Sequence, residues 1–589
     1  MLDGSSGDPN PPDPPACLNI RSNTTDGSDP NLRERPACLN VMSNGTDSDP
    51  KHPDRRAVLN VRSNATGSSD PSDRPTCLRL SSHGATLRGM ALGSAMHRFG
   101  KIFASSAGSA ATYTLSKDLR KLDSFLSHNW STPRWAKFTA LAMHYNFRQA
   151  VAAMLVTNVI CFSLVIGGVA PCFPAESTWP RSYVNFVLGA AVFWLVLLFG
   201  HELPQRVSGM PVQVFLDKTC IHQTDPELKQ RGIDALGGFL HESNMLTVLY
   251  SHTYFRKIWT VYEVACFLSS KTMDNCIFLP VFYAKVAGCA WATVYVYQAI
   301  PLFLYIVGGA GTEVFLPLRP MVFLLVCTPG IFVARRFMRE GDKLRRILRT
   351  FSVGGAICFD ENDRPKVYRC IIELMKFKQC VPQSCPDQEA LESFELLVQQ
   401  SMGRVAESML GLDTAACLPY RLALMPGLAF WLVSCETIAA KLVRGRPWLE
   451  TTTEAVHAVC ACFCILPLTM GTMCGLCAIG IQLPPRADPL VVFPVLVVTL
   501  IVWYAMDWAS WQTMLRGSTS AAWLPAFAAV TLLQAGLTWL AFSRRGLAWL
   551  RACRGARSPA EGGQVPGGPA PVPLGAPLAT GPGPAEAPL

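Results

Sequence analysis

Residues 245–268 read MLTVLYSHTYFRKIWTVYEVACFL, a short apolar run followed by apolar residues at helical spacing. The opening MLTVLY predicts a buried strand, and residues 259–268 predict a helix. On the amino-terminal side, residues 212–217 (VQVFLD) predict another strand and residues 227–242 another helix. On the carboxyl-terminal side, residues 276–283 (CIFLPVFY) predict a third strand. Strands that alternate with helices predict a parallel, doubly wound α/β sheet, which binds ligands beyond the carboxyl ends of its strands.

The chain as a whole is unusually apolar. It has 589 residues, of which 50% are hydrophobic and 16% are charged, and its mean hydropathy is +0.24. Soluble globular proteins carry about 25% charged residues. The 52 Lys and Arg residues exceed the 42 Asp and Glu residues, which gives a net charge of +10. This composition excludes a wholly soluble protein, a collagen and a fully disordered chain, and it indicates an integral membrane protein.

Eight apolar stretches have the length of about 20 residues that a membrane-spanning helix requires. They cover residues 149–170, 183–200, 285–309, 314–334, 421–438, 456–482, 488–507 and 521–542. Basic residues are concentrated before the first stretch, after the fourth and after the eighth. Because positively charged loops remain in the cytosol, these segments and both termini are predicted to be cytosolic. The basic residues therefore indicate topology and contact with membrane lipid, and no nucleic-acid partner is predicted.

This topology divides the chain into eight parts. Residues 1–87 contain decaying copies of one short motif, separated by Asp, Pro, Ser and Gly, and are predicted to be disordered because they cannot bury enough apolar surface. Residues 543–589 are predicted to form a basic juxtamembrane segment and a disordered tail rich in Pro, Gly and Ala. Between them lie, in order, a cytosolic segment with one strand and one helix (88–148), a transmembrane hairpin (149–200), the main α/β island (201–284), a second transmembrane hairpin (285–334), a basic helical cytosolic segment (335–420) and four transmembrane spans (421–542).

Four ordered segments of these islands resemble the Toll/interleukin receptor (TIR) domain family, nearest to its plant type. Residues 123–128 (DSFLSH) resemble the family's first strand, and residues 214–218 (VFLDK) resemble its second strand and the loop that follows. Ser251-x-x-Tyr254 followed by Trp259-x-x-x-Glu263 is similar to the segment that contains the family's glutamate. Residues 279–283 (LPVFY) resemble the fourth strand.

The resemblance implies a flavodoxin-like fold, homotypic association of the domains in signalling and, in some members, cleavage of NAD to nicotinamide and ADP-ribose products. It implies that Glu263 is catalytic, because a carboxylate near the ribose opposes the positive charge that develops as the glycosidic bond breaks. NAD would be a substrate, and no cofactor and no metal ion are predicted. The resemblance places these residues at the NAD site: Ser127, His128, Asp217, Lys218 and Trp259.

The chain departs from the family between the first two segments, because two predicted membrane spans separate residues 123–128 from residues 214–218. The sheet must then be completed around a membrane hairpin, and residues 352–359 are predicted to supply its fifth strand. Alternatives remain open. Glu263 can be a solvated residue of a docking domain without catalytic activity, or the chain can be a transporter or channel with a regulatory, non-catalytic TIR-like domain.

Overall fold

The computed structural model describes residues 74–80, 84–170, 183–203, 212–308, 311–411, 414, 416, 418–543, 545–546 and 548. All of them belong to one compact unit, residues 63–589. The predicted disordered tail, and most of the predicted disordered region 1–87, lie outside the described residues. Within 1–87 the prediction is wrong for Thr76–Leu78, which form a turn of 3-10 helix with Leu78 only 2% exposed.

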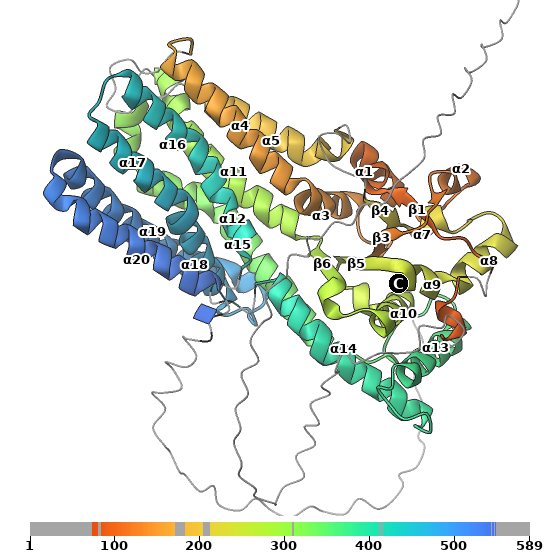
Figure 1. Cartoon of the computed structure of the whole chain (residues 1–589). Helices are drawn as coiled ribbons and strands as arrows, with labels where there is room; N and C mark the ends of the chain where they lie inside the picture. The colour runs from red at the N-terminus through yellow and green to blue at the C-terminus, as the bar shows by residue number, and fades with distance from the viewer. Residues whose placement is uncertain are drawn as a thin grey trace, which may run out of the picture. The chain divides into compact units, whose positions relative to one another are not determined.

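A six-stranded mixed sheet forms the centre of the α/β domain, in the order β2-β1-β4-β3-β5-β6 (Figure 1). Strands β4, β3, β5 and β6 are parallel, whereas β1 is antiparallel to both of its neighbours. The prediction of a parallel sheet is therefore correct for four strands only, and two short strands upstream of the first predicted strand extend it. The strands are β1 (Arg88–Ala91), β2 (Lys117–Asp118), β3 (Leu122–His128), β4 (Gln213–Phe215), β5 (Ser243–Tyr250) and β6 (Cys276–Pro280).

The chain leaves the sheet after β3 and returns to it at β4 by way of two long apolar helices. Helix α3 (Arg134–Tyr145) follows β3 and leads into α4 (Phe147–Ile166), and α5 (Val184–Phe199) runs back beside α4 (Figure 1). Strand β4 then pairs in parallel with β3, with Ser124 opposite Val214 and Phe125 opposite Phe215. The predicted pairing of these two distant segments is confirmed.

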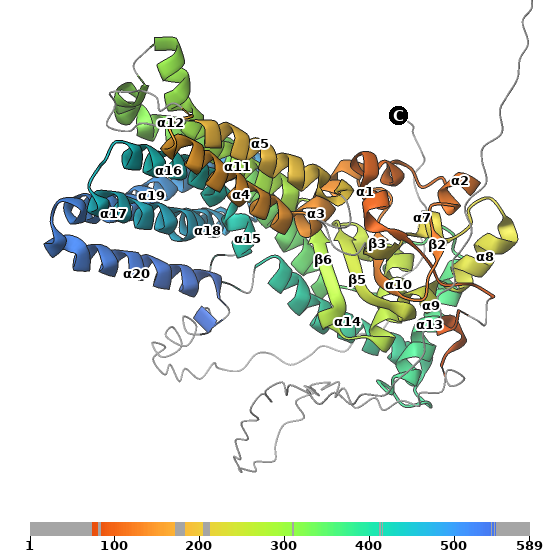
Figure 2. The same ribbon diagram turned by 45° about the horizontal axis from the view of Figure 1, so that its top comes forward.

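Apolar side chains alternate between the two faces of the sheet, because successive residues of a strand point to opposite sides. On one face, Phe125, Phe215 and Phe278 pack with α9 (Leu236–Glu242) and α10 (Ile258–Ser270). On the other face, Leu126 and Val214, with other strand residues, pack with α1 (Leu92–Gly100) and α3. Figure 2 shows β3, β5 and β6 side by side, with α1 and α3 above them and α9 below them in this view.

The remaining helices of the domain were predicted in part. The helix predicted over residues 227–242 is divided into α8 (Pro226–Asp234) and α9, and the one predicted over residues 259–268 is α10. The fifth strand predicted over residues 352–359 is wrong, because this segment makes only one isolated bridge, between Ile357 and Lys257. The other helices are η4 (Lys101–Ala104), α2 (Ala110–Tyr113), α7 (Asp217–Cys220), η6 (Tyr254–Arg256), α13 (Asp363–Phe377) and α14 (Asp387–Met409).

Among the described residues, eight helical stretches are long and apolar enough to cross a membrane, and each overlaps one predicted span. This agrees with a multi-pass membrane protein. The helices are α4, α5, α11 (Tyr283–Gly308), α12 (Gly311–Arg349), α16 (Met425–Val443), α17 (Trp448–Cys460) joined through the π-helical residues 461–465 to α18 (Leu466–Ala478), α19 (Asp488–Thr519) and α20 (Leu524–Phe542), with the short α15 (Tyr420–Ala423) before α16.

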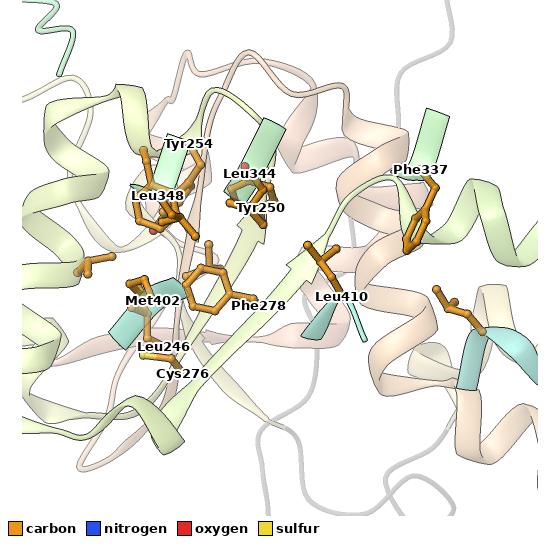
Figure 3. Packing of buried hydrophobic residues seen from close by; sticks show 14 of the residues in the cluster. Leu246, Tyr250, Tyr254, Cys276, Phe278, Phe337, Leu344, Leu348, Met402 and Leu410 are labelled. Carbon is orange, nitrogen blue, oxygen red and sulfur yellow. The ribbon is translucent and has the colours of Figure 1, made fainter. Parts of the chain in front are cut away.

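Helix α12 continues from its apolar stretch into the α/β domain. Its carboxyl-terminal part carries Leu344 and Leu348, which belong to the same buried core as Tyr250 of β5 and Phe278 of β6. Figure 3 shows these side chains gathered with Met402 of α14. This packing joins β6 and β5, the strand that borders the candidate site, to the carboxyl-terminal part of α12.

Candidate active site

Three polar side chains meet at the carboxyl end of β3, on the face covered by α10. The Ser127 hydroxyl donates a hydrogen bond to Oε2 of Glu263 and lies 2.6 Å from the hydroxyl of Tyr254. Ser127 and Tyr254 are 1% and 0% exposed, whereas Glu263 keeps part of its surface open. When Glu263 is ionised it can only accept, so Ser127 gives its single proton to Glu263 and Tyr254 donates to Ser127. The structure therefore brings together the predicted residues Ser127 and Glu263 and adds Tyr254.

Local sequence explains why these groups meet. Strand β5 ends at Tyr250, and the 3-10 turn Tyr254–Arg256 follows before α10 begins. The hydroxyl of Thr260, in the first turn of α10, donates to the carbonyl oxygen of Tyr254 and fixes that turn on the helix. Glu263 then lies one further turn along α10, level with the end of β3. The site is at the carboxyl edge of the parallel strands between β3 and β5, where the connections leave the sheet in opposite directions.

The surroundings of Glu263 favour its neutral form. Burial raises the pKa of the Glu263 carboxyl to about 8; the Ser127 hydrogen bond opposes this rise and the charge of Asp217 adds to it. Burial, and secondarily the negative charge of Glu263, hold the pKa of Tyr254 well above its ordinary value. Tyr254 therefore keeps its proton and can remain a hydrogen-bond donor over the physiological range.

His128 does not join this group, although it follows Ser127 directly. Adjacent residues of β3 point to opposite faces, and His128 faces the side covered by α3. Its ring centroid lies 4.4 Å from that of Trp130 and 5.5 Å from that of Phe103. Burial lowers the pKa of His128 to about 4, so the ring is neutral at physiological pH. Ser127 and His128, which were predicted to lie at one NAD site, therefore lie on opposite faces of the sheet.

Asp217 and Lys218 follow β4 and occupy the same edge, but their polar atoms have partners within the protein. Asp217 accepts hydrogen bonds from the backbone N–H of Lys218 (2.7 Å) and from Nε1 of Trp130 (2.9 Å). Nζ of Lys218 donates to the carbonyl oxygens of Ile102 (3.3 Å) and Ser105 (2.8 Å). Lys218 therefore holds the segment after α1 against the sheet. Contact of Asp217 or Lys218 with NAD stays a prediction.

Trp259 anchors α10 to α13. Its Nε1 donates to Oδ2 of Asp363 at 3.0 Å, and its ring packs edge-on against Tyr262 at 5.5 Å. The indole of Trp259 is therefore hydrogen-bonded to α13. It is not hydrogen-bonded to Glu263, which lies one helical turn further along α10. The place of Trp259 beside NAD stays a prediction.

Tyr254, Trp130 and Lys137 were not predicted to be site residues. Tyr254 belongs to the Ser-x-x-Tyr segment that resembles the family, but the segment did not indicate that Tyr254 contacts Ser127. Lys137 stands between Ala136 and Phe138 in a mainly apolar segment, which is the one sequence signal that could have drawn attention to it. Among the described residues, no group of His, Cys, Asp and Glu side chains could hold a metal ion.

Comparison with known proteins does not assign a function to these residues. No protein-family model, no curated protein and no solved structure matches the chain.

Proposed function

We propose that the α/β domain of this multi-pass membrane protein cleaves the bond between nicotinamide and ribose in NAD, with Glu263 as the catalytic carboxylate. The observation that supports this is the Tyr254–Ser127–Glu263 chain of hydrogen bonds at the carboxyl edge of β3. An ordered carboxylate at this edge of a doubly wound sheet is suited to a nucleotide ligand. The TIR-like sequence segments point to the same residue.

In the proposed reaction the bond between C1′ of the ribose and the nicotinamide nitrogen breaks, and its electron pair leaves with the ring. Nicotinamide departs as a neutral molecule because the ring nitrogen was cationic. The ionised Glu263 carboxylate opposes the positive charge on the ribose. Water then adds at C1′ and releases one proton, which gives ADP-ribose. Ser127 and Tyr254 are positioning residues, because they orient the carboxylate.

A turnover assay on the purified full-length protein in lipid nanodiscs tests the proposal. Wild type should release nicotinamide from NAD, and Glu263→Gln should lower the rate by about 100-fold or more, because it keeps the shape and loses the charge. Glu242→Gln is the matched control, since Glu242 is an exposed glutamate at the end of α9 and should leave the rate unchanged. A Glu263→Gln protein that turns over NAD at the wild-type rate would remove Glu263 from the mechanism.

Self-association belongs to the same proposal, because the resemblance implies contact between copies of the domain. Clustering of the protein at high density in a vesicle should raise the rate per molecule. A rate per molecule that does not depend on density would show that NAD cleavage does not require association of the domains. If clustered wild type cleaves no NAD, the docking role replaces catalysis.

Ion pairs inside the apolar helices favour a second candidate function, transport. Arg319 of α12 lies 3.3 Å from the Asp507 carboxylate of α19, and Nε2 of His457 in α17 lies 3.8 Å from the other oxygen of Asp507. Charged residues inside membrane spans are costly and commonly mark paths of ions or protons. Proton flux into vesicles containing wild type, abolished by Asp507→Asn, would support this role.

A further inference from the structure

Three buried polar atoms near the carboxyl end of β3 have no hydrogen-bond partner among the described residues. They are Nε2 of His128, Oγ1 of Thr132 and Nζ of Lys137. The exposed fractions of these residues are 9%, 6% and 0%. Nearly all buried polar groups in proteins have a partner, which can be a ligand or a water molecule. Three exceptions within residues 128–137 therefore indicate that something is bound there in the functional protein.

Aromatic rings lie beside Lys137 and His128. Nζ of Lys137 lies 4.9 Å from the ring centroid of Trp130 and 5.7 Å from that of Phe103. His128 packs edge-on against the same two rings. We call Phe103, His128, Trp130, Thr132 and Lys137 the Lys137 cluster. Trp130 is the partly exposed member, so its side chain separates the others from solvent.

The charge balance of the Lys137 cluster is positive. Burial lowers the pKa of Lys137 to about 8, with Asp217 opposing that change, so the ammonium form predominates at neutral pH. Asp217 accepts its hydrogen bonds from Trp130 and Lys218, and Lys218 is held by backbone carbonyl groups. His128 is neutral. An ammonium group in this setting is best satisfied by an anion.

We propose that the Lys137 cluster binds a phosphoryl group, with the Lys137 ammonium and the Thr132 hydroxyl as donors. A phosphoryl group has several strong acceptor oxygens, so one group can accept hydrogen bonds from both the ammonium and the hydroxyl. The amino-terminal end of α3, whose dipole favours anions, lies in the same segment. The site lies on the face of the sheet opposite Glu263, so it is a second site and does not depend on NAD cleavage.

The phosphoryl group can belong to a soluble molecule or to a lipid headgroup. Phe147, the first residue of the apolar helix α4, lies ten positions after Lys137 of α3. At the rise of an α-helix this is about 15 Å, so lipid headgroups at the start of α4 would lie near the Lys137 cluster. The chemistry of recognition is the same for both sources. Entry of either one requires the Trp130 side chain to move.

Calorimetric titration of the full-length protein in nanodiscs tests the proposal and separates the two sources. Inorganic pyrophosphate is the soluble probe, added to nanodiscs of pure phosphatidylcholine. For the lipid arm, the unfolding temperature is compared between phosphatidylcholine nanodiscs with and without phosphatidic acid. Binding of pyrophosphate supports a soluble ligand, and stabilisation by phosphatidic acid alone supports a headgroup. Wild type that responds to neither probe overturns the proposal and leaves buried water as the partner.

Lys137→Met is the decisive variant, because it keeps the length of the side chain and removes the charge. It should weaken binding of the effective probe by about tenfold or more, while the protein without ligand unfolds at the same or a higher temperature. Thr132→Val should also weaken binding. Lys121→Met is the matched control, since Lys121 is an exposed lysine just before β3. Unchanged binding by Lys137→Met would overturn the proposal, as would an equal loss with Lys121→Met.

Discussion

Glu263 carries its proton at neutral pH because its surroundings stabilise the charge poorly. Ser127 is the one hydroxyl that donates to the carboxylate among the recorded contacts, and Asp217 adds a second negative charge nearby. With the pKa of Glu263 at about 8, roughly one molecule in ten is ionised at pH 7. A carboxyl group with a pKa near neutral pH can supply its negative charge in the one step of a reaction that needs it.

The first prediction concerns the pH dependence of NAD cleavage. Because only ionised Glu263 opposes the ribosyl charge, the rate should rise as pH increases from 6 to 9, with a midpoint near the Glu263 pKa of about 8. Ser127 donates to the ionised form and lowers this pKa, so Ser127→Ala should move the midpoint to higher pH. A shift of about one pH unit corresponds to about 1.4 kcal/mol. A profile that is flat from pH 6 to 9 would contradict the assignment.

Part of the site could be read from the sequence. The pairing of Ser127 with Glu263 followed from ordered segments that resemble one family. The separation of His128 from Ser127 could have been derived as well, since neighbours on a strand face opposite sides. The Tyr254 contact and the buried Lys137 could not, because both depend on how a loop and a helix close over the sheet, which no local pattern encodes.

At the scale of helices and strands, long patterns were predicted well and short ones were not. A membrane span is a long run of apolar residues, so all eight were visible. Strands β1 and β2 have four and two residues and lack a clear alternation of apolar residues. They are strands because β4 offers a free edge that β1 covers, which is a tertiary effect. Residues 352–359 contain Gly354 and Gly355, which weaken a strand.

The second prediction concerns the close contact between α16 and the π-helical residues 461–465. A Cβ atom added at Gly427 of α16 would overlap the carbonyl oxygen of Cys462, a backbone atom that cannot rotate away. Gly427→Ala should therefore lower stability by about 1–3 kcal/mol, measured as a lower unfolding temperature in detergent. Gly475→Ala in α18 is the control, because an added Cβ there has open space and Ala favours helix. Equal behaviour of the two variants would show that α16 is not packed this closely.

At the scale of the whole described unit, α12 is one of the elements that connect the apolar bundle with the α/β domain. In the bundle, Nε of Arg335, 1% exposed, donates to Asp488 at 2.8 Å, and Arg339 donates to the same carboxylate at 2.7 Å. Arg335 also donates to the carbonyl oxygens of Cys477 and Ile479 at the end of α18. Two turns later, Leu344 and Leu348 enter the core of the sheet. A disturbance at Asp488 should therefore reach the domain through one continuous helix.

The third prediction follows from this connection. Asp488→Asn removes the carboxylate that neutralises Arg335, and a buried charge left without its partner costs about 3–5 kcal/mol. We expect a lower unfolding temperature and, because α12 carries Leu344 and Leu348, faster hydrogen exchange in β5 and β6. Asp342→Asn is the control on the same helix: it breaks an ion pair with Arg346, whose side chain is 62% exposed, and such pairs contribute about 0–1 kcal/mol. If Asp488→Asn destabilises the bundle while exchange in β5 and β6 stays at the wild-type rate, the two regions unfold independently and α12 does not couple them.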